Sequence, residues 1–160
     1  MDVFYRGKDR TRQAGATEER ERAVDNNAVQ QSQFVYLSGC ETPVLARLSY
    51  APSAPFTVSL AFRVDSEEWV EWEFSRDLLI TGLHAPAGIG DIRIRPDLPA
   101  PDDALLVIEL ESPDGYAAVE IDRGDVQEFV EATLSRVPLG YESERLDLDA
   151  VITSLTTARP

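Results

Sequence analysis

Residues 69–96 read WVEWEFSRDLLITGLHAPAGIGDIRIRP, and this stretch decides the fold. Residues 69–75 alternate between apolar and polar side chains, which predicts a strand with one buried face. A helix is expected from Arg76, because Ser75 can accept a hydrogen bond from its free N–H groups and Asp77 puts negative charge in its first turn. A turn then ends the helix before the next strand, and it carries Pro86, Gly88, Gly90 and Asp91. The predicted order is strand, helix, turn, strand.

Period-two alternation predicts further strands on both sides of this stretch. Before it they lie at residues 34–37, 44–50 and 56–65, and after it at 91–95, 104–111 and 115–121. The clearest of them is 56–65, whose apolar face is expected to carry Phe56, Val58, Leu60, Phe62 and Val64. The inward face of 104–111 is expected to carry Ala104, Leu106, Ile108 and Leu110.

Two later helices complete the predicted elements. Asp122 can cap a helix over residues 123–137, and a last helix is expected at about Leu148–Thr156. Because strands are grouped before each helix, the sequence predicts an α+β fold with curved antiparallel sheets of about seven strands and packed helices.

Composition separates an extension from a domain. Residues 1–30 contain equal numbers of acidic and basic residues and few aliphatic ones, which predicts a disordered N-terminal extension. The formal net charge of −14 therefore lies on residues 31–160, the predicted domain. A domain this acidic repels phosphate backbones, so no nucleic-acid binding is expected.

The residues that support catalysis or metal binding are scarce. His84 is the only histidine and Cys40 the only cysteine, which leaves no ligand set for zinc, no nucleophile–base pair and no intramolecular disulfide. Gly88-Ile89-Gly90 lacks the third glycine of a dinucleotide fingerprint and precedes a strand rather than a helix. We expect no enzyme activity, no cofactor and no metal.

Charged residues on the strands favour a solvated sheet face over a carboxylate active site. Glu71 and Glu73 alternate along one strand, as Glu109 and Glu111 do along another. The outward arginines, Arg93 and Arg95, are expected to meet one of these pairs across the sheet.

No apolar run is long enough to span a bilayer, and residues 1–12 carry no apolar signal region. We therefore expect a cytoplasmic protein without membrane insertion, which agrees with a single cysteine in a reducing compartment.

Large apolar residues also lie on the face predicted to be outward. Trp69 faces the same way as Glu71 and Glu73, so it either covers a sheet edge or packs under a helix, or it anchors an interface. The second face must then be covered by helices or by another subunit. The predicted partner or subunit interface consists of Trp69, Leu105, Val107 and Tyr116.

The spaced run VEW-F-RDLL--GL--P-G-GD-R--P, at residues 70–96, resembles the signature of the SsgA-like proteins, which are sporulation and cell-division regulators of actinomycete bacteria. The later pieces SP-G-A, VP-G-E and LDLD, at residues 112–117, 137–142 and 146–149, resemble the same family in the same order.

This resemblance implies a fold similar to the whirly class of single-strand nucleic-acid binders, assembled as a trimer. It also implies a non-enzymatic regulator that acts at the division septum, marks septum sites and recruits the tubulin-like protein FtsZ, with FtsZ or other SsgA-like proteins as partners. The alternative from the fold resemblance is a single-stranded nucleic-acid-binding protein, which needs a basic groove with stacking aromatics. An enzyme is the third hypothesis.

Overall fold

The computed structural model describes residues 27–97 and 104–145. The strands are β1 (Val29–Leu37), β2 (Val44–Tyr50), β3 (Thr57–Arg63), β4 (Trp69–Ser75), β5 (Ile92–Pro96), β6 (Leu105–Ser112) and β7 (Gly115–Asp122). The helices are α2 (Arg76–Gly82), α3 (Arg123–Arg136) and the short 3₁₀ helix η2 (Glu142–Arg145).

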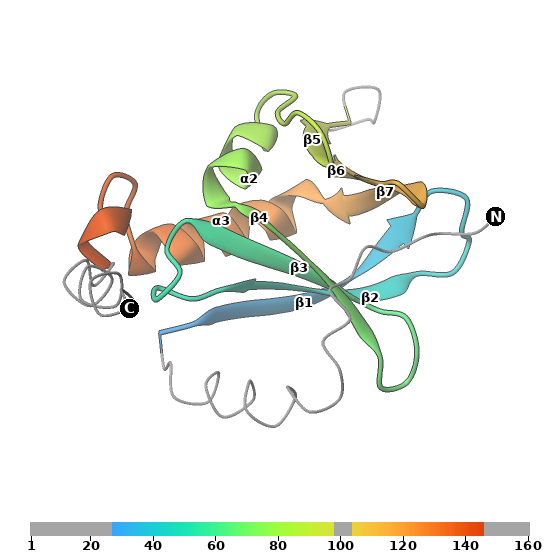
Figure 1. The fold of residues 1–160 in the computed structure, drawn as a ribbon, viewed down its shortest axis with the longest axis horizontal. Helices are drawn as coiled ribbons and strands as arrows, with labels where there is room; N and C mark the ends of the chain where they lie inside the picture. The colour runs from blue at the N-terminus through green and yellow to red at the C-terminus, as the bar shows by residue number, and fades with distance from the viewer. Residues whose placement is uncertain (1–26, 98–103, 146–160) are drawn as a thin grey trace, which may run out of the picture.

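The strands form one antiparallel sheet in the order β4-β3-β2-β1-β7-β6-β5. Strands β1–β4 and β5–β7 are two meanders, each followed by a helix, and β1 joins them. It pairs with β2 over residues 29–35 and with β7 at residues 36 and 37. The sheet curls around α3, with α2 beside it (Figure 1), so the predicted α+β fold with a curved antiparallel sheet is confirmed.

The first strand is longer than the sequence pattern predicts. It starts at Val29 rather than Phe34, so residues 29 and 30 belong to the sheet and not to the predicted extension. The hydrophobic pattern misses this part because Gln31 and Gln33 occupy inward positions, paired with Leu48 and Ala46. The Gln31 side chain donates 2.8 Å to the carbonyl of Asp125 in α3, and a helix backbone group thereby satisfies a polar residue under the helix.

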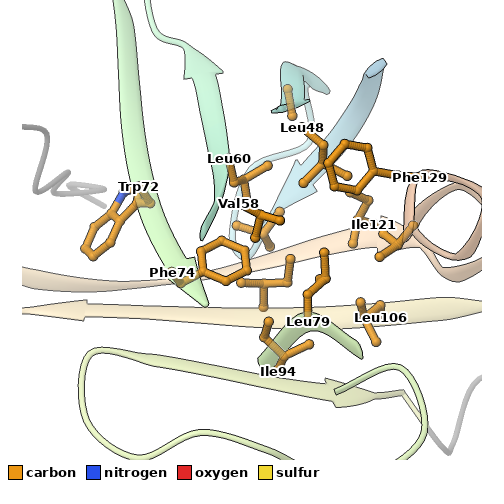
Figure 2. Close-up of a cluster of buried hydrophobic side chains, with 14 of the residues drawn as sticks. Leu48, Val58, Leu60, Trp72, Phe74, Leu79, Ile94, Leu106, Ile121 and Phe129 are labelled. Atoms are coloured by element: carbon orange, nitrogen blue, oxygen red, sulfur yellow. The ribbon is translucent and has the colours of Figure 1, made fainter. Parts of the chain in front are cut away.

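The core lies between the concave face of the sheet and the two helices (Figure 2). Leu60 and Trp72 are cross-strand neighbours, as are Val58 and Phe74, which confirms the predicted alternation of these strands. Helices α2 and α3 cover the same face, with the buried residues Leu79, Leu83, Val126, Phe129 and Val130.

Two residues expected in the core are exposed. Phe56 is 47% exposed, because the β3 ladder begins only at Thr57 and Phe56 belongs to the preceding turn. Ala104 is likewise exposed, since β6 begins at Leu105. Periodicity alone extended each strand by a residue into its connecting turn.

Helix α2 begins as the sequence predicts. The Ser75 side chain accepts a hydrogen bond from the Leu78 N–H at 3.0 Å, and Asp77 lies in the first turn. At the end of the helix, Gly82 lets α2 approach β5 closely, because a Cβ at this position would lie 2.5 Å from the Cβ of Ile94.

The predicted helix at about Leu148–Thr156 and residues 1–26 of the predicted extension lie outside the described residues.

Candidate protein-interaction surface

The sheet surface opposite α2 and α3, here called the outer face, has no helix of the described residues packed on it (Figure 1). Cross-strand pairing sets the neighbours on this face. One row runs from Tyr36 through Glu120 and Val107 to Arg95, across four strands from β1 to β5. The outer face is therefore a continuous surface that mixes apolar and charged side chains.

Exposed aromatic residues lie on this face. Phe34 is 69% exposed and Tyr36 50%, and both come from β1, the strand that joins the two meanders. We did not assign either to an interface from the sequence. The available signal was their alternation with Val35 and Leu37, which are buried on the opposite face.

Trp69 lies on the outer face near the edge of the sheet and is partly buried. The Arg47 guanidinium sits over its ring, with the carbon CZ 4.4 Å from the ring centroid. This is a cation–π contact between β2 and β4 that spans β3. The contact holds the indole against the sheet, and the ring remains available at its rim.

The structure places the other predicted interface residues in two different environments. Leu105 is partly buried and Tyr116 is 48% exposed, whereas Val107 is only 5% exposed between its cross-strand neighbours Arg95 and Glu120. Leu105, Val107 and Tyr116 lie on β6 and β7, while Trp69 lies on β4 at the far edge. The structure therefore does not bring Trp69 together with the other three.

Tyr116 is fixed by its hydroxyl group, which donates to Glu109 Oε1 at 2.6 Å. This hydrogen bond to the Glu109 carboxylate raises the pKa of Tyr116 above 10.0, and desolvation raises it further. The phenol therefore stays neutral and points a fixed ring toward solvent.

The predicted cross-sheet ion pairs form on one side only. Arg93 lies 3.6 Å from Glu109 and 3.5 Å from Glu111, which confirms that choice of partners. Pairing with Glu71 and Glu73 is wrong, because β4 and β5 are opposite edges of the sheet. Both of these ion pairs are largely solvent-exposed, so each contributes little to stability.

The signature loop between α2 and β5 is tied back onto the sheet. Ala87 and Ile94 exchange both backbone hydrogen bonds, at 2.8 and 2.9 Å. Gly88 has φ 103°, and a Cβ there would overlap the carbonyl oxygen of Ile92. Between the two glycines with positive φ, Ile89 is fully exposed. The predicted loop residues Pro86, Gly90 and Asp91 are exposed around it.

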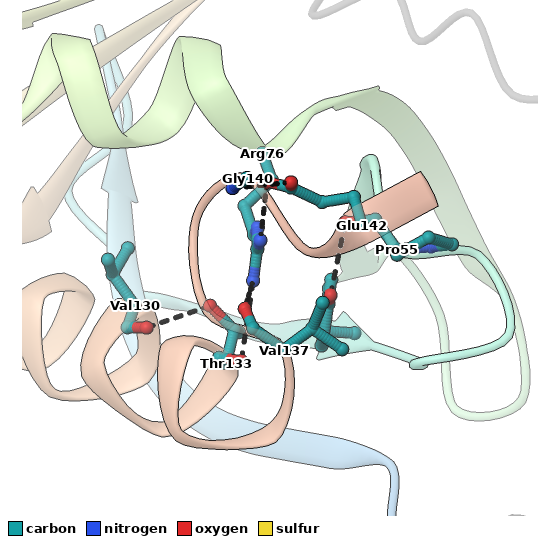
Figure 3. Close-up of polar contacts among 8 residues, drawn as sticks. Pro55, Arg76, Val130, Thr133, Val137, Gly140 and Glu142 are labelled. Atoms are coloured by element: carbon teal, nitrogen blue, oxygen red, sulfur yellow. Dashed lines mark hydrogen bonds and ion pairs between the residues drawn. The ribbon is translucent and has the colours of Figure 1, made fainter. Parts of the chain in front are cut away.

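Arg76 is the largest fully buried side chain among the described residues and connects three elements (Figure 3). Its guanidinium donates to the Val137 carbonyl at 2.7 Å and to the Thr133 carbonyl at 3.3 Å, both at the C-terminal end of α3. It also donates to Glu142 Oε1 at 2.8 Å and lies over the Tyr50 ring. One arginine thus fixes the α3 end and η2 against the start of α2.

Glu142 carries the matching charge. Its pKa lies below 4.5, chiefly because its own backbone N–H donates to the carboxylate, and then because of the Arg76 guanidinium. The Gly140 N–H also donates to this carboxylate, at 2.8 Å. The sequence gave no sign of this pair, since both residues appear there only as parts of the family signature.

The described residues hold no group of His, Cys, Asp or Glu side chains arranged to bind a metal ion. Within the same residues, no helix has the length and apolar character needed to cross a membrane.

Comparisons with known proteins place this fold. A family model described as "Streptomyces sporulation and cell division protein, SsgA" matches residues 44–142. A relative from Frankia casuarinae, named sporulation-specific cell division protein SsgB, is 38% identical over 128 residues, which cover 80% of this chain and 89% of the relative. A protein of the same name from Kineococcus radiotolerans is 41% identical over 121 residues, covering 75% and 73%.

Solved structures agree with the sequence matches. A structure described with mutations in SsgB that correlate to longitudinal cell division during sporulation of Streptomyces coelicolor has a TM-score of 0.68 at 35% identity, covering 74% of this chain and 95% of that chain. The SsgA-like sporulation-specific cell division protein of Thermobifida fusca has a TM-score of 0.68 at 33% identity, covering 79% and 94%. The chain therefore belongs to the SsgA family of sporulation and cell division proteins.

Proposed function

We propose that this protein is a non-catalytic adaptor of sporulation-specific cell division that works in the cytoplasm at the septum. In this proposal it assembles as a homo-oligomer, a trimer, and brings FtsZ to the septum site directly or through other SsgA-like proteins. Family membership supports the role in sporulation and division, and the outer face of the sheet supports the mode of action.

The observation that carries the proposal is the exposed aromatic surface at the centre of the outer face. Phe34, Tyr36 and Tyr116 are each about half or more exposed, and they come from the adjacent strands β1 and β7. Aromatic residues are enriched at the energetic centres of protein interfaces. Fixed hydroxyl geometry at Tyr116 lowers the entropy that a partner must remove on binding.

The charges on the same face argue against the alternative, binding of single-stranded nucleic acid. Such binding requires cations that are available to phosphates. Here Arg93 and Arg95 are near carboxylates, Arg63 donates to the backbone carbonyls of Asp65 and Ser66, and Arg47 covers Trp69. The aromatic surface is thus flanked by arginines that already have partners within the chain.

The proposal is tested by co-sedimentation with FtsZ polymers and by measuring mass in solution. A Phe34→Ser, Tyr36→Ser double variant is expected to lower binding to the polymers, the oligomer mass, or both. Phe56→Ser is the matched control, because Phe56 is similarly exposed but precedes β3 outside the outer face. Trp69→Ala tests the edge of the same face.

Unchanged polymer binding and unchanged mass in the double variant would exclude the central outer face as the interface. A parallel salt titration against single-stranded DNA tests the alternative. Tight, salt-sensitive binding to DNA without binding to FtsZ polymers would replace the adaptor proposal with the nucleic-acid one.

A further inference from the structure

The edge strand β4 is a second binding surface, independent of the proposed function. It pairs with β3 along its length and has no neighbouring strand on its other side among the residues that the structure describes. The opposite edge, β5, is partly closed by the Ala87–Ile94 bridge and ends in Pro96, which has no N–H. β4 therefore presents a backbone edge that can pair with a further extended segment.

A buried donor points toward this edge. Trp72 is 7% exposed, and its indole Nε1 has no hydrogen-bond partner within the described part of the chain. Buried indole N–H groups normally donate to an acceptor. Figure 2 shows Trp72 at the margin of the core cluster, beside β4, so an acceptor can reach it from beyond the edge of the sheet.

The two neighbours of Trp72 along β4 define what such a segment must carry. Glu71 and Glu73 are on the outer face, opposite to Trp72. A segment paired with β4 places cations next to these carboxylates when its outward residues are basic, and an acceptor next to Trp72 when the residue between them is acidic. The edge is thus complementary to a basic–acidic–basic sequence.

The N-terminal extension of this chain contains that sequence. Basic residues recur at every second position from 6 to 12, and they are Arg6, Lys8, Arg10 and Arg12. Asp9 lies between Lys8 and Arg10. Whether this segment runs parallel or antiparallel to β4, placing Lys8 and Arg10 beside Glu71 and Glu73 brings Asp9 opposite Trp72.

The chain is long enough to reach the edge. Cross-strand pairs place Val29, at the start of β1, level with Phe74 of β4, with β2 and β3 between them. Three strand spacings are about 15 Å. Residues 11–28 can span up to about 60 Å when extended, so either direction of pairing is within reach.

We propose that residues 6–12 pair with the free edge of β4 in the same chain. Lys8 and Arg10 lie beside the carboxylates of Glu71 and Glu73, and the Asp9 carboxylate accepts the hydrogen bond of Trp72 Nε1. The added strand protects the sheet from edge-to-edge association, and a partner that adds its own strand here must first displace it.

The test uses the full chain. In a Lys8→Glu, Arg10→Glu variant, amide hydrogens of residues 69–75 are expected to exchange about tenfold faster or more, because local opening becomes easier. Arg20→Glu, Arg22→Glu is the matched control, with the same change of charge in the same extension. Equal exchange in wild type and the first variant, or faster exchange only in the control, would overturn the proposal.

The indole signal gives a second readout. The chain has two tryptophans, so ¹⁵N labelling yields two indole resonances, which Trp72→Phe assigns. Asp9→Ala is expected to shift the Trp72 resonance strongly. A Trp72 resonance that does not move excludes Asp9 as its acceptor.

A disulfide test separates pairing within a chain from pairing between chains. In a Cys40→Ser background, Lys8→Cys is combined with Glu71→Cys for parallel pairing or with Glu73→Cys for antiparallel pairing. A disulfide-linked monomer in one combination supports the proposal and gives the direction. Disulfide-linked dimers alone would instead assign the edge to a second copy, and no disulfide in either combination would reject pairing.

Discussion

Replacing Arg76 with methionine removes a buried guanidinium while leaving a flexible apolar side chain in its place. In the native protein this group donates to the carbonyls of Val137 and Thr133 and to the Glu142 carboxylate. The Arg76→Met variant therefore leaves acceptors from two other elements without their donor. The end of α3 and η2 lose their shared attachment to α2.

The magnitude follows from these contacts. Hydrogen bonds to a charged group contribute about 1.5–3 kcal/mol each, and removing one member of a buried ion pair costs about 3–5 kcal/mol. The contacts of one guanidinium are not additive, so we expect a total loss of about 3–5 kcal/mol in the free energy of unfolding. With about 2–4 °C per kcal/mol for a domain of this size, Tm falls by about 6–20 °C.

Urea unfolding followed by tryptophan fluorescence measures this loss, since both tryptophans lie on β4. Arg76→Lys is the control: it keeps the charge, but an ammonium group lacks the planar fork needed to reach all three acceptors, so an intermediate loss is expected. Adding Glu142→Leu to Arg76→Met is expected to recover part of the stability, because no buried charge is then left alone. An Arg76→Met protein within about 1 kcal/mol of wild type would refute this account of the buried pair.

Three further measurements test other parts of the structure. Gly82→Ala is expected to lose about 1–3 kcal/mol in urea unfolding, because the new methyl group overlaps Ile94 and forces α2 away from β5; a gain in stability would contradict this close approach. The lowered pKa of Glu142 contributes stability that is present above pH 4.5 and is lost as pH falls through the folded value, so Glu142→Gln should flatten the pH dependence of the urea midpoint below that pH. The raised pKa of Tyr116 contributes stability that is present below pH 10.0 and is lost as pH rises through the folded value. Phenolate absorbance should show one tyrosine titrating late, and Tyr116→Phe should remove it.

Local chemistry made much of the fold predictable. The cap at Ser75, the Asp122 cap of α3, which accepts from the Asp125 N–H, and the alternation along β4 depend only on residues close in sequence. The structure has these elements with almost the predicted bounds. The pattern failed where a long-range contact replaced the usual signal, as at Gln31, whose inward polar side chain donates to the α3 backbone.

The candidate interface was only partly accessible to the same reasoning. Alternation placed Trp69, Leu105, Val107 and Tyr116 on the outer face, where the structure has them. It did not show that Val107 is buried there, because burial depends on the neighbours that strand pairing supplies.

By itself, the sequence determined the elements, their order, the family resemblance and the acidic character of the domain, since each depends on composition or on short spacing. Only the tertiary structure decided that β1 joins the two meanders into one sheet, that Arg76 meets Glu142 across 66 positions, and that β4 and β5 are the edges. The physical reason is that register and packing bring together residues far apart in the chain, and no local pattern specifies which distant groups will meet.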